Sequence, residues 1–251
     1  MLTGKSPHWG GALVRREATG YGLVYFVEEM LKARSETLAG KTCIVSGAGN
    51  VAIYAIEKLQ MLGAKVVACS DSENVVFHAD GIDLNTLRRL KEVERRRLRH
   101  YVDVHPAAQC LQPGSLWRIP CQIALPCATE KELHEEDVRT LIADGCIVVA
   151  EGANMPTTPG GIRILQEADV AFAPGKAANA GGVATSALEM QQNASRDAWT
   201  FEHTERRLQE IMCRIHRDCY DTAAEFGSEG NYVAGANIAG FRRVAEAMLA
   251  F

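Results

Sequence analysis

A glycine-rich turn is the segment of this sequence that points most directly to chemistry. It reads Ser46-Gly47-Ala48-Gly49-Asn50-Val51-Ala52 and lies between a short apolar run and a helical pattern. Gly47 permits a tight turn, Gly49 lets the backbone approach a pyrophosphate, and Ala52 lets the helix pack close to the strand. A helix that begins here presents free N–H groups to an anion. We therefore predict a dinucleotide site formed by Ser46, Gly47, Gly49, Asn50 and Val51. The alternative is a connecting turn that binds nothing.

The end of the next predicted strand bears on which dinucleotide is bound. Ser70-Asp71-Ser72 follows the run Lys65–Cys69. In NAD enzymes an acidic residue about 20 positions after the glycines bonds the ribose diol, and Asp71 is placed to do so. The hydroxyls of Ser70 and Ser72, and the basic run Arg95-Arg96-Arg97, instead suit a 2′-phosphate. Residue chemistry alone is therefore compatible with NAD or NADP. The basic run also reads as a solvated helix face.

Other polar residues follow predicted strands and a small-residue segment. Thr129 comes after the run that ends at Leu125, and Asn154 comes after the run that ends at Ala150. Because ligands bind at the carboxyl ends of strands in open α/β sheets, we expect both side chains to face a ligand rather than to cap helices. The segment Pro174–Val183 has no strand or helix period, which predicts a loop. Its Lys176 is interpreted as an exposed lysine in preference to a catalytic amine.

Strand-like and helix-like patterns alternate through most of the chain. The predicted strands are Thr42–Val45, Lys65–Cys69, Gln122–Leu125, Ile147–Ala150 and Val170–Phe172. The predicted helices are Val51–Leu62, Asp83–Leu98, Glu132–Ala143, Gly161–Glu167, Glu202–Phe226 and Gly240–Phe251. This alternation predicts an α/β fold with a doubly wound, Rossmann-like parallel sheet and flanking N- and C-terminal helices. We expect a helical segment at 1–38, a dinucleotide-binding domain at 39–182 and a helical segment at 183–251.

Composition and spacing exclude several classes of protein. The net charge of −4 provides no positive field for nucleic acid or an anionic membrane. No apolar run approaches the roughly 20 residues that span a bilayer, and residues 1–10 lack the apolar core of a signal peptide. The eight cysteines contain no CxxC pair and the seven histidines no HxxxH pair. We therefore expect a soluble, cytoplasmic protein with reduced thiols, no metal, and no nucleic-acid or membrane partner.

Longer strings carry a resemblance that the glycine turn alone does not. They are RREATGYGLVYF (Arg15–Phe26), VSGAGNVA (Val45–Ala52), ALPCAT (Ala124–Thr129), AEGANMPTT (Ala150–Thr158), APGKAANAGGVATSALEMQQN (Ala173–Asn193) and NYVAGANIAGF (Asn231–Phe241). Over nearly its whole length the chain resembles the cofactor domain and C-terminal helices of the hexameric glutamate dehydrogenases. The resemblance implies reversible, NADP-linked reductive amination of 2-oxoglutarate to glutamate with ammonium, in a homohexameric parent enzyme.

The resemblance also implies roles for individual residues. Thr19 is expected at the nicotinamide amide, and Ala128, Thr129 and Asn154 are expected at the nicotinamide ribose. Asn179 is expected near the ring. Val183 and Ser186 are expected at the far carboxylate of the five-carbon acid. The order Ser70-Asp71-Ser72 is similar to that of the NADP-linked members, which makes NAD the less favoured cofactor.

Two departures from the family pattern bear on function. The lysine that NADP-linked relatives place against the 2′-phosphate is expected near Glu94, where the adjacent arginines would have to replace it. Family members also carry about 200 residues ahead of this region, including the catalytic lysine and aspartate, and nothing before Thr19 resembles that domain. We therefore predict no catalytic residue in this chain. The alternatives are a nucleotide-binding module without turnover and a related dehydrogenase acting on leucine, valine or phenylalanine.

Overall fold

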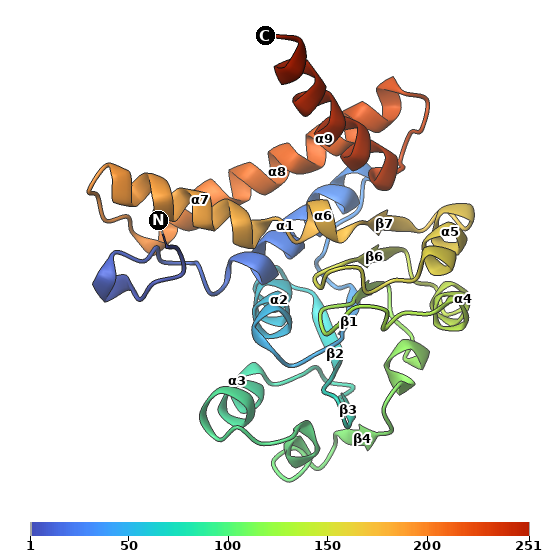
Figure 1. Ribbon diagram of the computed structural model, residues 1–251. Coiled ribbons are helices and arrows are strands. Elements are labelled where there is room, and N and C mark those ends of the chain that lie inside the picture. The colour runs from blue at the N-terminus through green and yellow to red at the C-terminus, as the bar shows by residue number, and fades with distance from the viewer. Residues whose placement is uncertain (1, 251) are drawn as a thin grey trace.

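One seven-stranded sheet organises the chain in the computed structural model, which describes residues 2–250 (Figure 1). Its strands are β1 (Thr42–Val45), β2 (Lys65–Ser70), β3 (Val75–Phe77), β4 (Gln109–Leu111), β5 (Ile123–Leu125), β6 (Val148–Ala150) and β7 (Ala171–Ala173). Their order across the sheet is β4-β3-β2-β1-β5-β6-β7. The α/β prediction is confirmed, and all five predicted strands are present to within one residue at either end. The order reverses at β1, so the ends of β1 and β5 open a crevice where ligands bind in such sheets.

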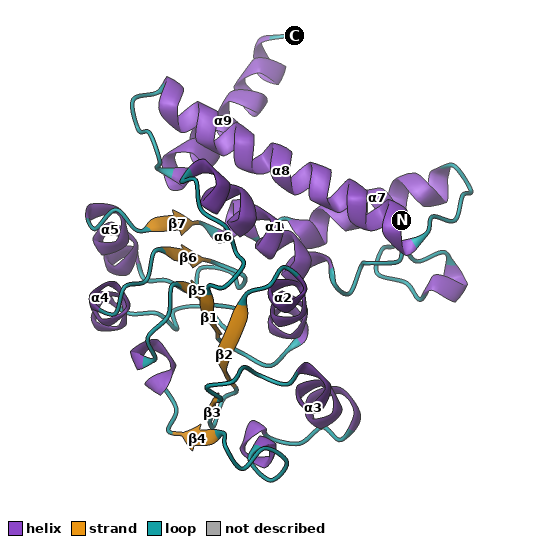
Figure 2. Cartoon of the chain, turned by 180° about the vertical axis from the view of Figure 1, so that it is seen from behind, coloured by secondary structure: helices purple, strands orange, loops and turns teal. Residues whose placement is uncertain are grey.

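Both faces of the sheet are buried, which explains the continuous apolar runs of its parallel strands. Cys43 and Val45 belong to a core that they share with helices α1 (Ala18–Ala33) and α2 (Asn50–Met61). Ile44, between them, belongs to a second core under α4 (Glu135–Ala143) and α5 (Pro159–Glu167). Figure 2 shows α4 and α5 on one side of the sheet and α2 on the other. The alternation of side chains therefore supplies both cores.

The sheet is mixed rather than wholly parallel, which corrects the prediction. Strand β3 pairs antiparallel with β2, and β4 pairs antiparallel with β3. Each of these strands has three residues. The equally short β5, β6 and β7 are buried along their whole length and were predicted, whereas β3 is half-buried at its end and β4 is mostly exposed, so neither forms a fully buried run. The two strands extend the sheet beyond β2, on the side where the segment 71–101 folds.

Two further segments differ from the prediction. Asp83–Leu98 is not one helix: α3 (Leu84–Arg88) passes into a π-helical turn at Arg89–Val93, and a 3₁₀ turn follows at Leu98–Tyr101. Arg95 has a positive φ of 53°, which an α-helix does not allow, so the helix cannot continue through this residue. The segment predicted as a loop contains α6 (Gly175–Ala178) and the start of α7 (Gly181–Ala194). The segment shows no helical period in its sequence, because α7 packs through the backbone of small residues rather than through large apolar side chains.

Three helices close the chain. After α7 come α8 (Phe201–Glu225) and α9 (Tyr232–Leu249). The predicted span of α8 is confirmed to within a residue, whereas α9 begins eight residues before Gly240; Phe251 lies outside the described residues. These helices pack across α1, as Figure 1 shows, and α1 packs in turn on α2. Among residues 2–250, no helix is both long and apolar enough to cross a membrane.

Candidate functional site

The glycine turn joins β1 to α2 as the sequence predicts. Gly47 has a φ of 86°, and a Cβ on it would lie 3.2 Å from the Cα of Ala128. Gly49 is the N-cap of α2, and a Cβ there would meet nothing within 4 Å. Among the described side chains, none caps the start of α2, whereas Thr158 caps α5. The first amides of α2 therefore face open space and are available to an anion.

A cleft of about 610 Å³ lies over this turn, and we call it the turn cleft. Of the predicted site residues it is lined by Ser46, Gly47, Gly49, Ser70, Asp71, Ser72, Ala128 and Thr129. Ser70 Oγ accepts a hydrogen bond of 3.0 Å from the amide of Gly47, which ties the turn to the end of β2. Asn50 is the exception among the predicted turn residues: its side-chain amide donates to the carbonyl of Arg16 at 2.6 Å. Only its backbone remains available to a ligand.

The Asp71 carboxylate is hydrogen-bonded within the protein. Its carboxylate accepts hydrogen bonds of 3.0, 3.0 and 2.9 Å from the amides of Glu73, Asn74 and Leu98. Burial alone would raise the pKa of Asp71, but these hydrogen bonds outweigh it and lower the pKa. The carboxylate therefore stays ionised and holds the loop after β2 against the 3₁₀ turn at Leu98. Its acceptors are occupied by the protein rather than offered to a ribose diol.

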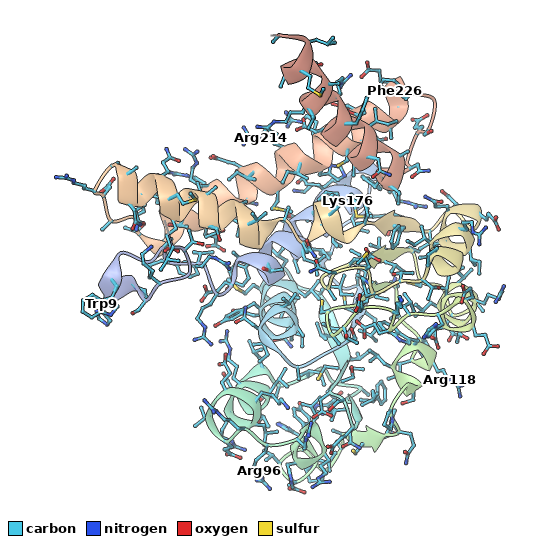
Figure 3. The ribbon with its side chains drawn as sticks, viewed as in Figure 1. Trp9, Arg96, Arg118, Lys176, Arg214 and Phe226 are labelled. Atoms are coloured by element: carbon cyan, nitrogen blue, oxygen red, sulfur yellow. The ribbon has the colours of Figure 1, made fainter. Side chains whose placement is uncertain are left out.

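Two cations lie in the turn cleft: Arg97, which belongs to the basic run considered for a 2′-phosphate in the sequence analysis, and Lys91, which that analysis did not place. Lys91 Nζ lies 3.5 Å from the Asp71 carboxylate, and Arg97 donates to Ser72 Oγ at 2.9 Å. Glu94, where a phosphate-binding lysine was expected, instead pairs with Arg89 and Arg96. Arg96 lies at the outer edge of this segment (Figure 3). The π-helical turn and the positive φ at Arg95 rotate the segment, so Lys91 and Arg97 face the cleft and Glu94 does not.

A second cleft of about 820 Å³ adjoins the first, and we call it the helix cleft. Of the predicted site residues it is lined by Thr19, Val51, Ala128, Thr129, Asn154, Asn179, Val183 and Ser186. Cys127, Ala128 and Thr129 line both clefts. The two clefts therefore form one continuous path that passes the carboxyl ends of β1, β5 and β6.

Close helix packing sets the position of Thr19. A Cβ on Gly181 would lie 2.1 Å from the carbonyl oxygen of Ala18, so α7 contacts α1 through its backbone. A Cβ on Gly182 would lie 2.4 Å from Thr19 Oγ1. Only glycine fits at these two positions without a shift, and the first turn of α7 therefore brings Val183 and Ser186 beside Thr19.

Two asparagines and one buried glutamate order the loops of the helix cleft. Asn179 Nδ2 donates to Asn154 Oδ1 at 2.9 Å. Glu151 accepts from the amides of Gly175 at 2.7 Å and Thr157 at 3.2 Å, which fixes α6 to the end of β6. Burial raises the pKa of Glu151, although these hydrogen bonds oppose the shift. Asn154 does not cap a helix, since Thr158 caps α5.

Arg15 is a site residue that the sequence analysis quoted only within a string. It lines the helix cleft, and its Nε donates to Ser186 Oγ at 3.0 Å. Lys176 lies outside the residues that line either cleft. It is exposed on α6 and donates to Asn237 at 2.5 Å (Figure 3). The sequence does not predict the contact between Arg15 and Ser186, because the two residues are 171 positions apart in the chain.

Ser46 is buried at the junction of the clefts, and its hydroxyl is used within the protein. It donates to Glu132 at 2.8 Å and accepts from the amides of Cys127 at 2.7 Å and Ala128 at 3.2 Å. Its amide donates to the carbonyl of Leu125 at 3.0 Å, so the hydroxyl and the amide of Ser46 are both used within the protein. Thr129 contributes its amide to Glu132 at 3.3 Å and does not cap α4, whose N-cap is His134.

Comparison with known proteins matches this geometry to one family. Residues 10–250 match the family model described as glutamate/leucine/phenylalanine/valine dehydrogenase. The chain belongs to this family. Among curated relatives, the NADP-specific glutamate dehydrogenase of Helicobacter pylori is 50% identical over 257 residues, covering 100% of this chain and 57% of the relative. The NAD(P)-specific glutamate dehydrogenase of Xylanibacter ruminicola is also 50% identical, with the same coverage of both chains.

Solved structures of glutamate dehydrogenases share the fold. The Plasmodium falciparum enzyme superimposes with a TM-score of 0.96 at 42% identity, over 99% of this chain and 54% of that chain. The chain thus spans little more than half the length of the glutamate dehydrogenases it matches. The family match and the cleft over the glycine turn together identify the chain as the nucleotide-binding portion of a glutamate dehydrogenase-family protein.

Proposed function

We propose that this chain is the cofactor-binding portion of an NADP(H)-linked glutamate dehydrogenase. The observation that carries the proposal is the continuous path of the two clefts, with an uncapped helix start at its centre and two cations at one end. NADP would lie with its adenosine 2′-phosphate at Lys91, Arg97 and Ser72. Cations and a hydroxyl suit a phosphate, and the occupied Asp71 carboxylate presents no free acceptor to a ribose diol.

The residues present fit such a cofactor. The pyrophosphate would meet the amides after Gly49, where no side chain fills the space. Thr129, Asn154 and Asn179 would hold the nicotinamide ribose and ring, and Thr19 the ring amide. When bound, the nicotinamide supplies or accepts a hydride; the chain orients the ring toward the helix cleft and shields one of its faces.

The far end of the helix cleft would hold the acid substrate. Ser186 and the backbone beside Val183 would contact the distal carboxylate of 2-oxoglutarate or glutamate. Arg15 bonds Ser186 and places a positive charge within the same cleft. A guanidinium next to a hydroxyl suits a carboxylate, which supports a dicarboxylic substrate over the apolar side chains of leucine, valine or phenylalanine.

A cofactor-binding module without turnover is the second candidate, and one observation favours it for the isolated chain. Among the described residues that line the helix cleft, Arg15 is the only cation, and no lysine or histidine is present there. Reductive amination needs a group that transfers protons to the substrate, and an arginine does not titrate near neutral pH. Glu130 is the one carboxylate among the described residues that line the cleft, and it is exposed, so a catalytic amine or imidazole would come from another domain or chain.

Two measurements on the purified chain test the proposal. NADPH fluorescence enhancement on mixing reports binding, and initial-rate NADPH oxidation with 2-oxoglutarate and ammonium reports turnover. We expect binding of NADPH in preference to NADH, and no turnover by this chain alone. Absence of binding to either cofactor would contradict both candidates, whereas turnover would show that the helix cleft holds acid–base groups that we have not assigned.

A further inference from the structure

Glu132 connects the two walls of the turn cleft, and the proposed function leaves it without a role. Its Oε1 accepts hydrogen bonds from Ser46 Oγ at 2.8 Å, the amide of Ala128 at 3.0 Å and the amide of Thr129 at 3.3 Å. Its own carbonyl accepts from the indole N–H of Trp117 at 3.1 Å. A single carboxylate oxygen therefore joins the residue before the glycine turn to the loop after β5.

The charge of Glu132 is poorly compensated. In the described part of the chain, its donors are a hydroxyl and two amides, none of which carries a charge. Burial raises the pKa of Glu132, and these hydrogen bonds only partly oppose the shift. Burial therefore makes the ionised form of Glu132 less favourable than it is in water, in a cleft that would bind an anion under the proposed function.

The groups around Glu132 do not supply the missing positive charge. The Cys127 thiol beside it is buried, and burial together with the charge of Glu132 raises the pKa of that thiol, so it stays neutral. Across the cleft, Lys91 pairs with Asp71 and Arg97 with Glu73, and among the described contacts neither cation bonds Glu132. The neighbours of Glu132 in the chain are Glu130 and Lys131, and Lys131 is exposed and makes no ion pair within residues 2–250.

A dinucleotide in the turn cleft would add the negative charge of its pyrophosphate next to Gly47 and Gly49, in the cleft that Glu132 lines. A like charge favours the neutral form of a carboxyl group. The proton has a place to go: in the described chain no donor bonds Oε2, while Oε1 keeps all three of its hydrogen bonds. Protonation therefore removes the repulsion without breaking the contacts that join the two walls.

We propose that Glu132 is a positioning residue that takes up a proton from solvent when the dinucleotide binds, which couples cofactor affinity to pH. The inference rests on the proposed dinucleotide site. The affinity for the dinucleotide therefore falls as pH rises, because protonating Glu132 costs more free energy at higher pH.

Isothermal titration of NADPH into three forms of the chain tests this coupling. The forms are the wild type, Glu132→Gln and the control Glu136→Gln, which removes an exposed carboxylate of α4 outside both clefts. Titration in two buffers of different ionisation enthalpy measures the protons taken up. Gln keeps an oxygen acceptor for the same three donors but does not titrate. The 2′-phosphate of NADPH itself titrates near neutrality, and this contribution is common to all three forms and cancels in their difference.

We expect the wild type and Glu136→Gln to take up more protons than Glu132→Gln. The Kd of the wild type should rise by about tenfold more than that of Glu132→Gln as pH increases above the pKa that Glu132 has in the free chain, since tenfold is the factor that one unit of pKa coupling gives. Equal proton uptake by the wild type and Glu132→Gln would overturn the inference. Circular dichroism and the thermal midpoint report whether Glu132→Gln has folded.

A second measurement needs no variant. The infrared difference spectrum of the wild type on addition of NADPH should gain the C=O band of a protonated carboxyl group, and its absence would contradict the inference. If NADPH binds to none of the three forms, the proposed function fails, and the inference fails with it. If NADPH binds without proton uptake at Glu132, the inference alone fails.

Discussion

The helix cleft and the turn cleft are built from different kinds of structure. The helix cleft is lined by regular elements, α1 and α7, and by the loops that end β5 and β6, with glycine contacts such as Gly182 against Thr19. The turn cleft takes one wall from the glycine turn and the other from short, irregular elements after β2. The first cleft is fixed by packing, whereas the second is fixed by side-chain hydrogen bonds to Asp71.

This structural difference corresponds to two kinds of cofactor recognition, one common to nicotinamide dinucleotides and one specific to the 2′-phosphate. The glycine turn and the regular helices suit any nicotinamide dinucleotide. Lys91 and Arg97, on the irregular wall, would distinguish a 2′-phosphate from a hydroxyl. Under the proposed function, ligands that occupy one cleft or both would report on the two separately: NADPH would occupy both, NADH would do so without the 2′-phosphate, and 2′,5′-ADP would occupy the turn cleft alone.

Removing both cations of the turn cleft should have the largest effect. In Lys91→Ala/Arg97→Ala we expect NADPH affinity to fall about 100-fold, because two charge-assisted contacts with the phosphate are lost. NADH affinity should change less than about threefold. Fluorescence titration measures both, and Arg99→Ala is the matched control because Arg99 is exposed and lies outside the residues that line the cleft. An equal loss for the two cofactors would remove the assignment of the 2′-phosphate site.

A side chain at Gly49 should weaken every ligand that carries a pyrophosphate. We expect Gly49→Val to lower NADPH and NADH affinity alike, by roughly tenfold, because the side chain occupies the space beside the start of α2. The thermal midpoint should not change, since the φ of Gly49 is −90° and its surroundings are open. A large fall in the midpoint would mean that the glycine serves the fold rather than a ligand.

Asn179→Ala should affect the helix cleft alone. The substitution removes the 2.9 Å hydrogen bond to Asn154 and the proposed contact with the nicotinamide end. We expect NADPH to bind about fivefold more weakly, the value of one hydrogen bond. Affinity for 2′,5′-ADP should be unchanged. Weaker binding of 2′,5′-ADP would show that the two clefts are not independent.

Gly182→Ala should have the smallest effect of the four. The new methyl group would lie 2.4 Å from Thr19 Oγ1, and the threonine hydroxyl can rotate away. We expect a loss of about threefold in NADPH affinity, since one contact is displaced rather than deleted. Thr19→Val should reproduce the loss, and 2′,5′-ADP should again serve as the unaffected ligand. A Gly182→Ala protein that binds NADPH normally would exclude Thr19 from the site.

The fold was predictable wherever a segment was long enough to show a period. Thr42–Val45 and the helix that ends at Glu225 were assigned to within a residue. Strands β3 and β4 were not, because they lie at the edge of the sheet and are only partly buried, unlike the equally short β5, β6 and β7. The π-helical turn at Arg89–Val93 was missed because its residues have ordinary helical chemistry, and the register change arises from packing.

The residues of the candidate site also fall into two groups, those that the sequence predicts and those that only the folded chain reveals. Residues at the ends of predicted strands, such as Thr129 and Asn154, were placed by chain order and by family resemblance. The role of Asp71 was not predictable, because it depends on an amide at Leu98, 27 residues away, that only the folded chain brings near. Lys91 was missed because the family pattern pointed to Glu94, whereas Arg97 belongs to the basic run that was considered for a 2′-phosphate.

The antiparallel extension of the sheet has a further consequence for how the family diversifies. Strands β3 and β4 extend the sheet from the edge of β2 that does not pair with β1, and they share no hydrogen bonds with β1, β5, β6 or β7. The loops between and beyond them carry the residues that would read the 2′-phosphate. Insertions or substitutions there leave the parallel strands and the glycine turn in place. Cofactor preference, as proposed here, would therefore depend on a segment at the margin of the sheet, and a loop exchange that alters it would have to keep Leu90, Leu98 and Tyr101, which belong to the main core.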